Sequence, residues 1–112
     1  MKTKRGTIGW VMFGAVWAAG CGVFDTIEAR QLAREGNALY MEYDYRAAIE
    51  KYNQAIAVDP ETPNVYLNLG YSHFSIYDPA SDSEQERQAA VQAVEAFEKH
   101  LARNPQDEAA RV

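Results

Sequence analysis

The sequence predicts an all-α fold made of two consecutive helix-turn-helix units, the second of which carries an insertion. An internal repeat is the first observation: "GNALYMEYDY" at 36–45 matches "GYSHFSIYDP" at 70–79 in its glycine and its Tyr-Asp pair, 34 residues apart. Further along, Ala48, Tyr52 and Pro60 recur as Ala93, Phe97 and Pro105, 45 residues apart. A spacing that grows from 34 to 45 residues predicts an eleven-residue insertion, "DPASDSEQERQ", inside the second unit.

Helical spacing and helix-breaking residues place two helices in each unit, with unit 1 over about residues 29–62 and unit 2 over about 63–107. Asp25 and Glu28 have capping-box spacing and predict the start of the first helix. Pro60 ends the second helix, and Pro63 suits the first turn of the third. The last helix is expected to begin after Ser81 or Ser83 and to close near Asn104–Pro105. Apolar and small residues of unit 1 recur three and four apart, as on one helix face: Leu32, Gly36, Leu39 and Tyr40, then Tyr45, Ala48, Ile49, Tyr52, Ala55 and Ile56.

These residues resemble the tetratricopeptide repeat (TPR) family. The likeness covers about residues 29–107, with Glu35 and His100 standing where the family usually has leucine and alanine. It implies a short right-handed α-solenoid, in which small residues let paired helices approach and aromatic rings fill the wedge between them. The matching residues are Leu32, Gly36, Tyr45, Ala48, Tyr52, Ala55 and Pro60 in unit 1, and Tyr66, Leu69, Gly70, Ala93, Phe97 and Pro105 in unit 2.

The N-terminus reads as an export signal. Lys2, Lys4 and Arg5 precede residues 7–20, which carry no charged side chain and, as a helix, are shorter than a membrane span. The stretch "AAGC" resembles the bacterial lipobox, although Ala18 stands where that motif prefers leucine. The resemblance implies a signal peptide over 1–20, cleavage at Ala18, Ala19 and Gly20, a lipidated Cys21 with a short tether over 21–24, and a TPR domain over 25–112. The alternative is an ordinary signal or N-terminal anchor in which the single cysteine is incidental.

Composition argues against nucleic-acid binding and catalysis. The chain has 11 basic and 16 acidic residues, a net charge of −5. Loss of the three basic residues of the leader would leave a net charge of about −8, and nucleic acid favours clustered cations.

His73 and His100 lie on apolar helix faces and are interpreted as packed side chains. Zinc-ligand spacing, a serine nucleophile motif and a phosphate-binding glycine loop are absent from the sequence, so we expect no catalytic residue, metal or cofactor.

The TPR resemblance implies a concave groove, lined by the first helix of each unit, that binds a protein or peptide partner. Asn37 and Asn68 match two asparagines of the carboxylate clamp found in some family members, but Ala33 replaces the clamp lysine, so a true clamp is rejected. Ala33 and Ser75 are also expected to face the groove. The other expected groove residues are Arg30, Arg34, Asn37, Tyr40, Met41, Asn64, Leu67, Asn68, Tyr71 and Phe74.

The sequence therefore predicts a non-catalytic, palmitate-carrying lipoprotein of the bacterial cell envelope, a scaffold for a protein partner in envelope assembly. Gly22 follows the cysteine where inner-membrane retention typically calls for aspartate, which favours the outer membrane, on its periplasmic or its surface side. The alternative is a structural subunit that packs through its repeats in a homo-oligomer or larger complex. Val91, Val94, Phe97 and Leu101 form an apolar stripe on the last helix, so the domain is expected to self-associate or to be marginally stable alone.

Overall fold

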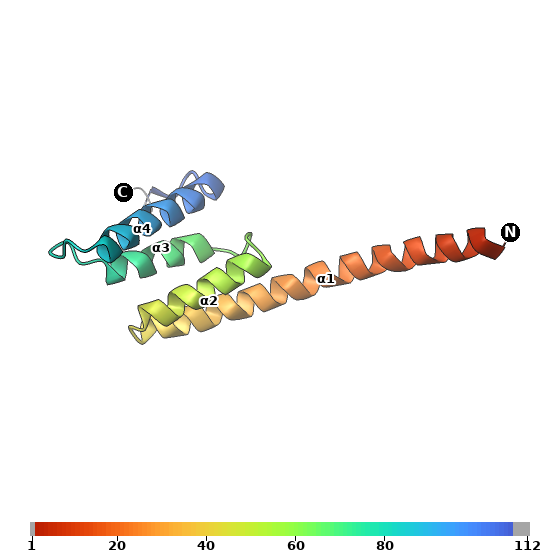
Figure 1. Ribbon diagram of the computed structural model, residues 1–112, viewed down its shortest axis with the longest axis horizontal. Helices are drawn as coiled ribbons and strands as arrows, with labels where there is room; N and C mark the ends of the chain where they lie inside the picture. The colour runs from red at the N-terminus through yellow and green to blue at the C-terminus, as the bar shows by residue number, and fades with distance from the viewer. Residues whose placement is uncertain (1, 109–112) are drawn as a thin grey trace.

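The computed structural model describes the backbone of residues 2–108 and the side chains of residues 22–108. Within that range the chain forms four helices and no strand: α1 (Lys2–Met41), α2 (Tyr45–Val58), α3 (Val65–Ile76) and α4 (Glu84–Arg103). Each helix from α2 onward packs beside the one before it, and the N-terminal part of α1 extends away from the other helices (Figure 1). The C-terminal part of α1 and α2 form unit 1, and α3 and α4 form unit 2.

Local signals in the sequence explain most of the helix boundaries. Asp44 caps α2 by accepting a hydrogen bond from the Ala47 amide at 3.3 Å, and α2 ends at Val58 because Pro60 cannot continue the helix. Ser83 caps α4 in the same manner, accepting from the Glu86 amide at 3.2 Å. Asn104 is the C-cap of α4, which ends at Arg103. The expected ends of the second and last helices are therefore confirmed, and Ser83 rather than Ser81 is the cap of α4.

Two expected helix starts are wrong. Asp25 does not cap a helix, because α1 runs through it without a break from Lys2, and residues 21–24 are helical. No proline interrupts this stretch, and the Thr26 hydroxyl donates back to the Gly22 carbonyl at 3.0 Å within the helix. The third helix begins at Val65 and not at Pro63, because Asn64 adopts a left-handed conformation (φ 61°) that separates the proline from the helix.

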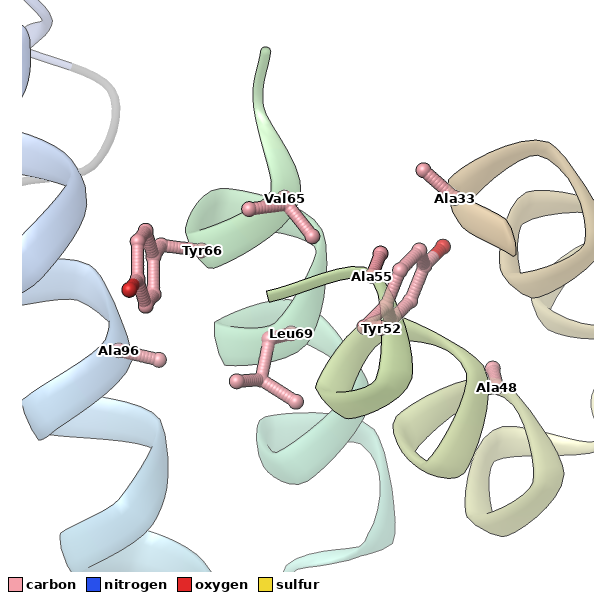
Figure 2. Close-up of a cluster of buried hydrophobic side chains, with 8 residues drawn as sticks. All are labelled: Ala33, Ala48, Tyr52, Ala55, Val65, Tyr66, Leu69 and Ala96. Atoms are coloured by element: carbon pink, nitrogen blue, oxygen red, sulfur yellow. The ribbon is translucent and has the colours of Figure 1, made fainter. Parts of the chain in front are cut away.

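The core lies along the junction of the two units. Val65 and Leu69 of α3 lie beside Tyr52 and Ala55 of α2, while Tyr66 points toward α4 (Figure 2). Burial of these side chains removes apolar surface from water at about 25 cal/mol per Å². A second small cluster, Ala93 and Phe97 with Leu67 and Leu101 around it, joins α3 and α4. Of the residues expected on one helix face, Ala48, Tyr52 and Ala55 are buried in unit 1, and Phe97 is buried in unit 2. Val91 and Val94 of the expected stripe on the last helix are exposed.

Candidate functional site

A groove runs between α1 and α3 on one side of the molecule. It consists of two adjoining hollows, of about 230 and 340 Å³, that share Asn37. We call the two together the α1–α3 groove. Its α1 residues, from Arg30 to Met41, extend over about 16 Å at 1.5 Å of rise per residue. The lining residues are Asn37, Tyr40, Met41, Tyr52, Asn68 and Tyr71 in the first hollow, and Arg30, Ala33, Arg34, Asn37, Thr62 and Pro63 in the second.

Two asparagine side chains lie at the centre of this groove. Asn37 Oδ1 accepts a hydrogen bond from the Tyr52 hydroxyl at 2.6 Å and another from Asn68 Nδ2 at 3.1 Å. Burial, and to a lesser degree Tyr40, raises the pKa of Tyr52 to about 12, so its phenol stays protonated and donates. These bonds leave Asn37 Nδ2 as a donor and Asn68 Oδ1 as an acceptor. One peptide group of a bound partner could use both atoms. Its C=O would accept a hydrogen bond from Asn37 Nδ2, and its N–H would donate one to Asn68 Oδ1.

One end of the groove is aromatic and apolar. The Tyr40 hydroxyl lies 3.3 Å from Ser75 Oγ of α3, and the Tyr40 ring meets Tyr45 edge-on at 5.1 Å between centroids. Tyr71 meets Phe97 edge-on at 5.3 Å and still exposes 39% of its surface. Met41 is one of the most exposed large apolar residues in the described part of the chain. This end can therefore take an apolar side chain.

The other end of the groove is basic. Arg30 and Arg34 are exposed, one turn apart on α1, and neither forms an ion pair with another residue of the described range. In a chain with a net charge of −5, two cations without an acidic partner form a local positive site. An acidic side chain or a carboxylate could bind there through charge-assisted hydrogen bonds.

Four residues expected in the groove lie elsewhere or at its border. Asn64 precedes α3 and lines a different hollow, beside Arg103 of α4. Leu67 packs against the Ala93 and Phe97 cluster and lines neither hollow of the groove. Phe74 is exposed but lines neither hollow, and Ser75 takes part only through its contact with Tyr40. The remaining expected residues line the groove; that they bind a partner stays a prediction.

The sequence interpretation missed three lining residues, of which Tyr52 matters most. Tyr52 was expected only as a core residue, and its ring is indeed buried. Its hydroxyl nevertheless reaches Asn37. A signal was available, because the hydroxyl of a buried tyrosine usually finds a hydrogen-bond partner, whereas Phe97 at the matching position of unit 2 needs none. Thr62 and Pro63 also line the groove.

The two histidines are packed side chains. A cleft between α2 and α4, which Gln88 and Gln92 help to line, marks the α2–α4 side of the molecule, and His73 of α3 lies in it. His73 is buried, its Nδ1 has no hydrogen-bond partner among the described residues, and burial lowers its pKa below the usual 6.5. His100 is buried at the end of α4, and its Nε2 lies 2.8 Å from Asp107 Oδ2. Within the described residues no three His, Cys, Asp or Glu side chains gather as metal ligands would.

The expected processing site lies outside the described side chains. Ala18, Ala19, Gly20 and Cys21 belong to α1, whose side chains are described only from residue 22 onward. Of the described residues, none belongs to a helix that combines the length and the apolar character needed to cross a membrane.

The repeat and the helix order define an all-α helical-repeat protein, which confirms the expected fold class. A family model for the TPR repeat matches residues 36–76, from the middle of unit 1 to the end of α3. The chain is also 38% identical over 60 residues to small glutamine-rich tetratricopeptide repeat-containing protein 2 of Mycosarcoma maydis. The aligned region covers 52% of this chain and 17% of that protein's length. No solved structure gives a significant match.

Proposed function

We propose that the chain is a non-catalytic adaptor that binds a protein partner in the α1–α3 groove. The observation that carries this proposal is the unpaired donor and acceptor of Asn37 and Asn68, set between an apolar end and a basic end. The match to the TPR repeat supports it, because such repeats generally bind proteins. The groove fits an extended segment whose peptide group meets the two amides. An apolar side chain of that segment would lie near Tyr40 and an acidic group near Arg34.

A photo-crosslinking experiment tests the groove in living cells. A photoreactive amino acid at Met41, in the groove, should crosslink one partner, whereas the same group at Gln88, on the α2–α4 side, should not. Asn37→Ala and Tyr40→Ala should each weaken the purified complex by about 1–3 kcal/mol, as interface hot spots do. The proposal would be contradicted if the partner crosslinked equally well from Met41 and from Gln88. It would also be contradicted if neither alanine variant changed the affinity of the purified complex.

We further propose that the chain is the precursor of a lipoprotein of the bacterial envelope, anchored through Cys21, with the outer membrane favoured and the partner bound there during envelope assembly. The stretch "AAGC" at 18–21 supports this. Val23, Phe24 and Ile27 also support it, because they are exposed apolar residues of α1 directly after the cysteine. If the anchor holds α1 beside a bilayer, these apolar side chains would be buried against the lipid. The net negative charge contributes nothing to binding anionic lipid, so acyl chains would supply the affinity, at about 0.8 kcal/mol per buried CH₂.

Mass spectrometry of the purified protein tests the anchor. The wild-type chain should begin at an acylated Cys21, and Cys21→Ser should yield an unprocessed or soluble product, because thioether acylation needs the sulfur. Phe24→Ser, which removes one exposed apolar side chain beside the anchor, should remain processed and acylated. Normal processing and membrane retention of Cys21→Ser would overturn the lipoprotein proposal without bearing on the groove.

A structural subunit is the second candidate function, and one observation favours it. Val91 and Val94 are exposed on α4, where they form an apolar surface at the end of unit 2. In a homo-oligomer these residues would pack against other copies, and the groove would hold no separate ligand. Sedimentation of the purified chain separates the two candidates: a monomer across a hundredfold range of concentration would exclude the homo-oligomer.

A further inference from the structure

The internal repeat makes the two ends of the solenoid comparable position by position. Ala33, Ile49 and Ile56 of unit 1 correspond to Leu67, Val94 and Leu101 of unit 2, at offsets of 34 and 45 residues. In unit 1 all three belong to or pack against the core cluster that contains Val65 and Leu69 of α3. The following helix therefore covers this face of unit 1.

The corresponding face of unit 2 has no covering helix among the described residues. We call it the end face; it consists of Leu67, Tyr71, Phe74, Val91, Val94 and Leu101. Phe74 is 59% exposed, Val91 56%, Val94 46% and Tyr71 39%. At the matching positions of unit 1, Asn37 and Tyr40 contact Asn68 and Ser75 of α3. In unit 1, therefore, the residues at these two positions of α1 contact the next helix, α3. Tyr71 and Phe74 hold the same two positions on α3, so a helix that covered unit 2 would contact them.

We propose that the end face binds an amphipathic helix of a partner protein, which packs there as α3 packs on unit 1. The template is α3 itself, a helix of 12 residues. It buries Val65, Leu69 and Ser72 at spacings of four and three. The partner helix should therefore present two aliphatic residues four apart and a small residue three further along. Glu98 lies on α4 one turn from Val94 and from Leu101, at the border of the end face, where unit 1 has Asn53. A basic residue of the partner helix near Glu98 therefore completes the match.

Stacking of a second copy is disfavoured by the opposite end of the molecule. At the positions where α3 has Val65, Leu69 and Ser72, α1 has Gln31, Glu35 and Ala38. Glu35 is paired with Lys51 at 3.0 Å, and Lys51 lowers the pKa of Glu35 below its usual value, so this carboxylate stays charged. The first helix of another copy would thus bring a charged pair to an apolar face. Two end faces in contact would bring two Glu98 carboxylates and two acidic chains together.

The experiment uses the full chain and a synthetic peptide of residues 62–77, which contains α3, labelled with a fluorophore. Binding is measured by fluorescence anisotropy, with a scrambled peptide as control. We expect saturable binding that Val94→Glu weakens at least tenfold, because a charge would be buried in the contact. Gln92→Glu adds the same charge to the α2–α4 side of the same helix and should change affinity less than twofold. Asn37→Ala, in the groove, should also have little effect.

Circular dichroism of each variant shows whether it folds. Phe74→Glu, at an exposed end-face position, replaces Val94→Glu if that variant does not fold. Absence of binding, equal weakening by Val94→Glu and Gln92→Glu, or loss of binding through Asn37→Ala would each overturn the proposal. Dimerisation of the chain that Val94→Glu abolishes, and that excludes the peptide, would assign the end face to a second copy instead. Val94 and Phe74 line neither hollow of the α1–α3 groove, so the effect of a charge at these positions tests the end face separately from the proposed function.

Discussion

At the scale of single residues, two glycines set how closely the helices of each unit approach. A Cβ at Gly36 would lie 2.7 Å from the Tyr52 ring, and one at Gly70 would lie 2.7 Å from the Phe97 ring. Gly36→Ala gains about 1 kcal/mol of helix propensity, but overpacking costs about 1–3 kcal/mol. We therefore expect a net loss of stability in urea unfolding. Gly22→Ala is the control, because nothing lies within 4 Å of its added Cβ; equal midpoints for the two variants would contradict this account.

His73 makes the stability of the domain depend on pH. Its buried imidazole has a pKa lowered by desolvation, while the unfolded chain binds a proton near pH 6.5. Because the unfolded state takes up the proton first, the free energy of unfolding falls as the pH drops below about 6.5, until the folded pKa is reached. The charged groups that line the two hollows beside His73 are Arg46 and Glu50 of α2 and Glu86, Glu95 and Lys99 of α4.

His73→Leu removes this titration and keeps an apolar side chain of similar bulk. Urea unfolding of both proteins at pH 7.5 and at pH 5 measures the effect. The variant should lose less stability than the wild type between the two pH values. A variant whose stability falls by the same amount as the wild type would show that other groups cause the whole pH dependence.

At the scale of single elements, α4 depends on its N-cap. Ser83 accepts from the Glu86 amide, and the acidic Glu84 and Glu86 lie in the first turn, where the helix dipole favours negative charge. Ser83→Ala should lower the free energy of unfolding by about 1 kcal/mol. Ser81 only accepts a longer bond, 3.4 Å, from the Ser83 amide, so Ser81→Ala should cost less than half as much. A larger loss from Ser81→Ala would mean that the helix begins earlier.

Helix existence and helix ends were predictable where a residue type enforces them. Pro60 and Ser83 act through their own chemistry, so the sequence located the end of α2 and the start of α4. Asp25 was a weaker signal, because a capping box requires the chain before it to leave the helix, and no residue from 19 to 24 compels that. The start of α3 depends on the left-handed backbone conformation of Asn64, and no pattern in the neighbouring sequence predicted that conformation.

The candidate site was predictable to the level of the helix face. The spacing of Arg34, Asn37 and Met41 placed them together on α1, and they do line one groove. The rotation of α3 about its own axis decides whether Leu67 faces the groove or α4, and packing against Phe97 fixes that rotation. The contact between Tyr52 and Asn37 depends on how far a side chain reaches between helices, which helical spacing does not specify.

At the scale of the whole molecule, the two units are joined by one continuous core. Leu69 of α3 is buried in the cluster that also holds Tyr52 and Ala55 of α2, so neither unit completes its core alone. In a solenoid, each unit is stabilised by its interface with the next. Two units have one such interface, and its loss should destabilise both of them.

Leu69→Ala tests this coupling. Removal of a buried leucine side chain costs about 2–5 kcal/mol, a large part of the 5–15 kcal/mol that stabilises a typical domain. We expect hydrogen exchange to accelerate to a similar degree in α2 and in α4, although the substitution lies in α3. Val94→Ala shortens an exposed side chain and should leave exchange in both helices nearly unchanged. If Leu69→Ala accelerated exchange only in α3 and α4, unit 1 would be stable without unit 2, and the two units would fold independently.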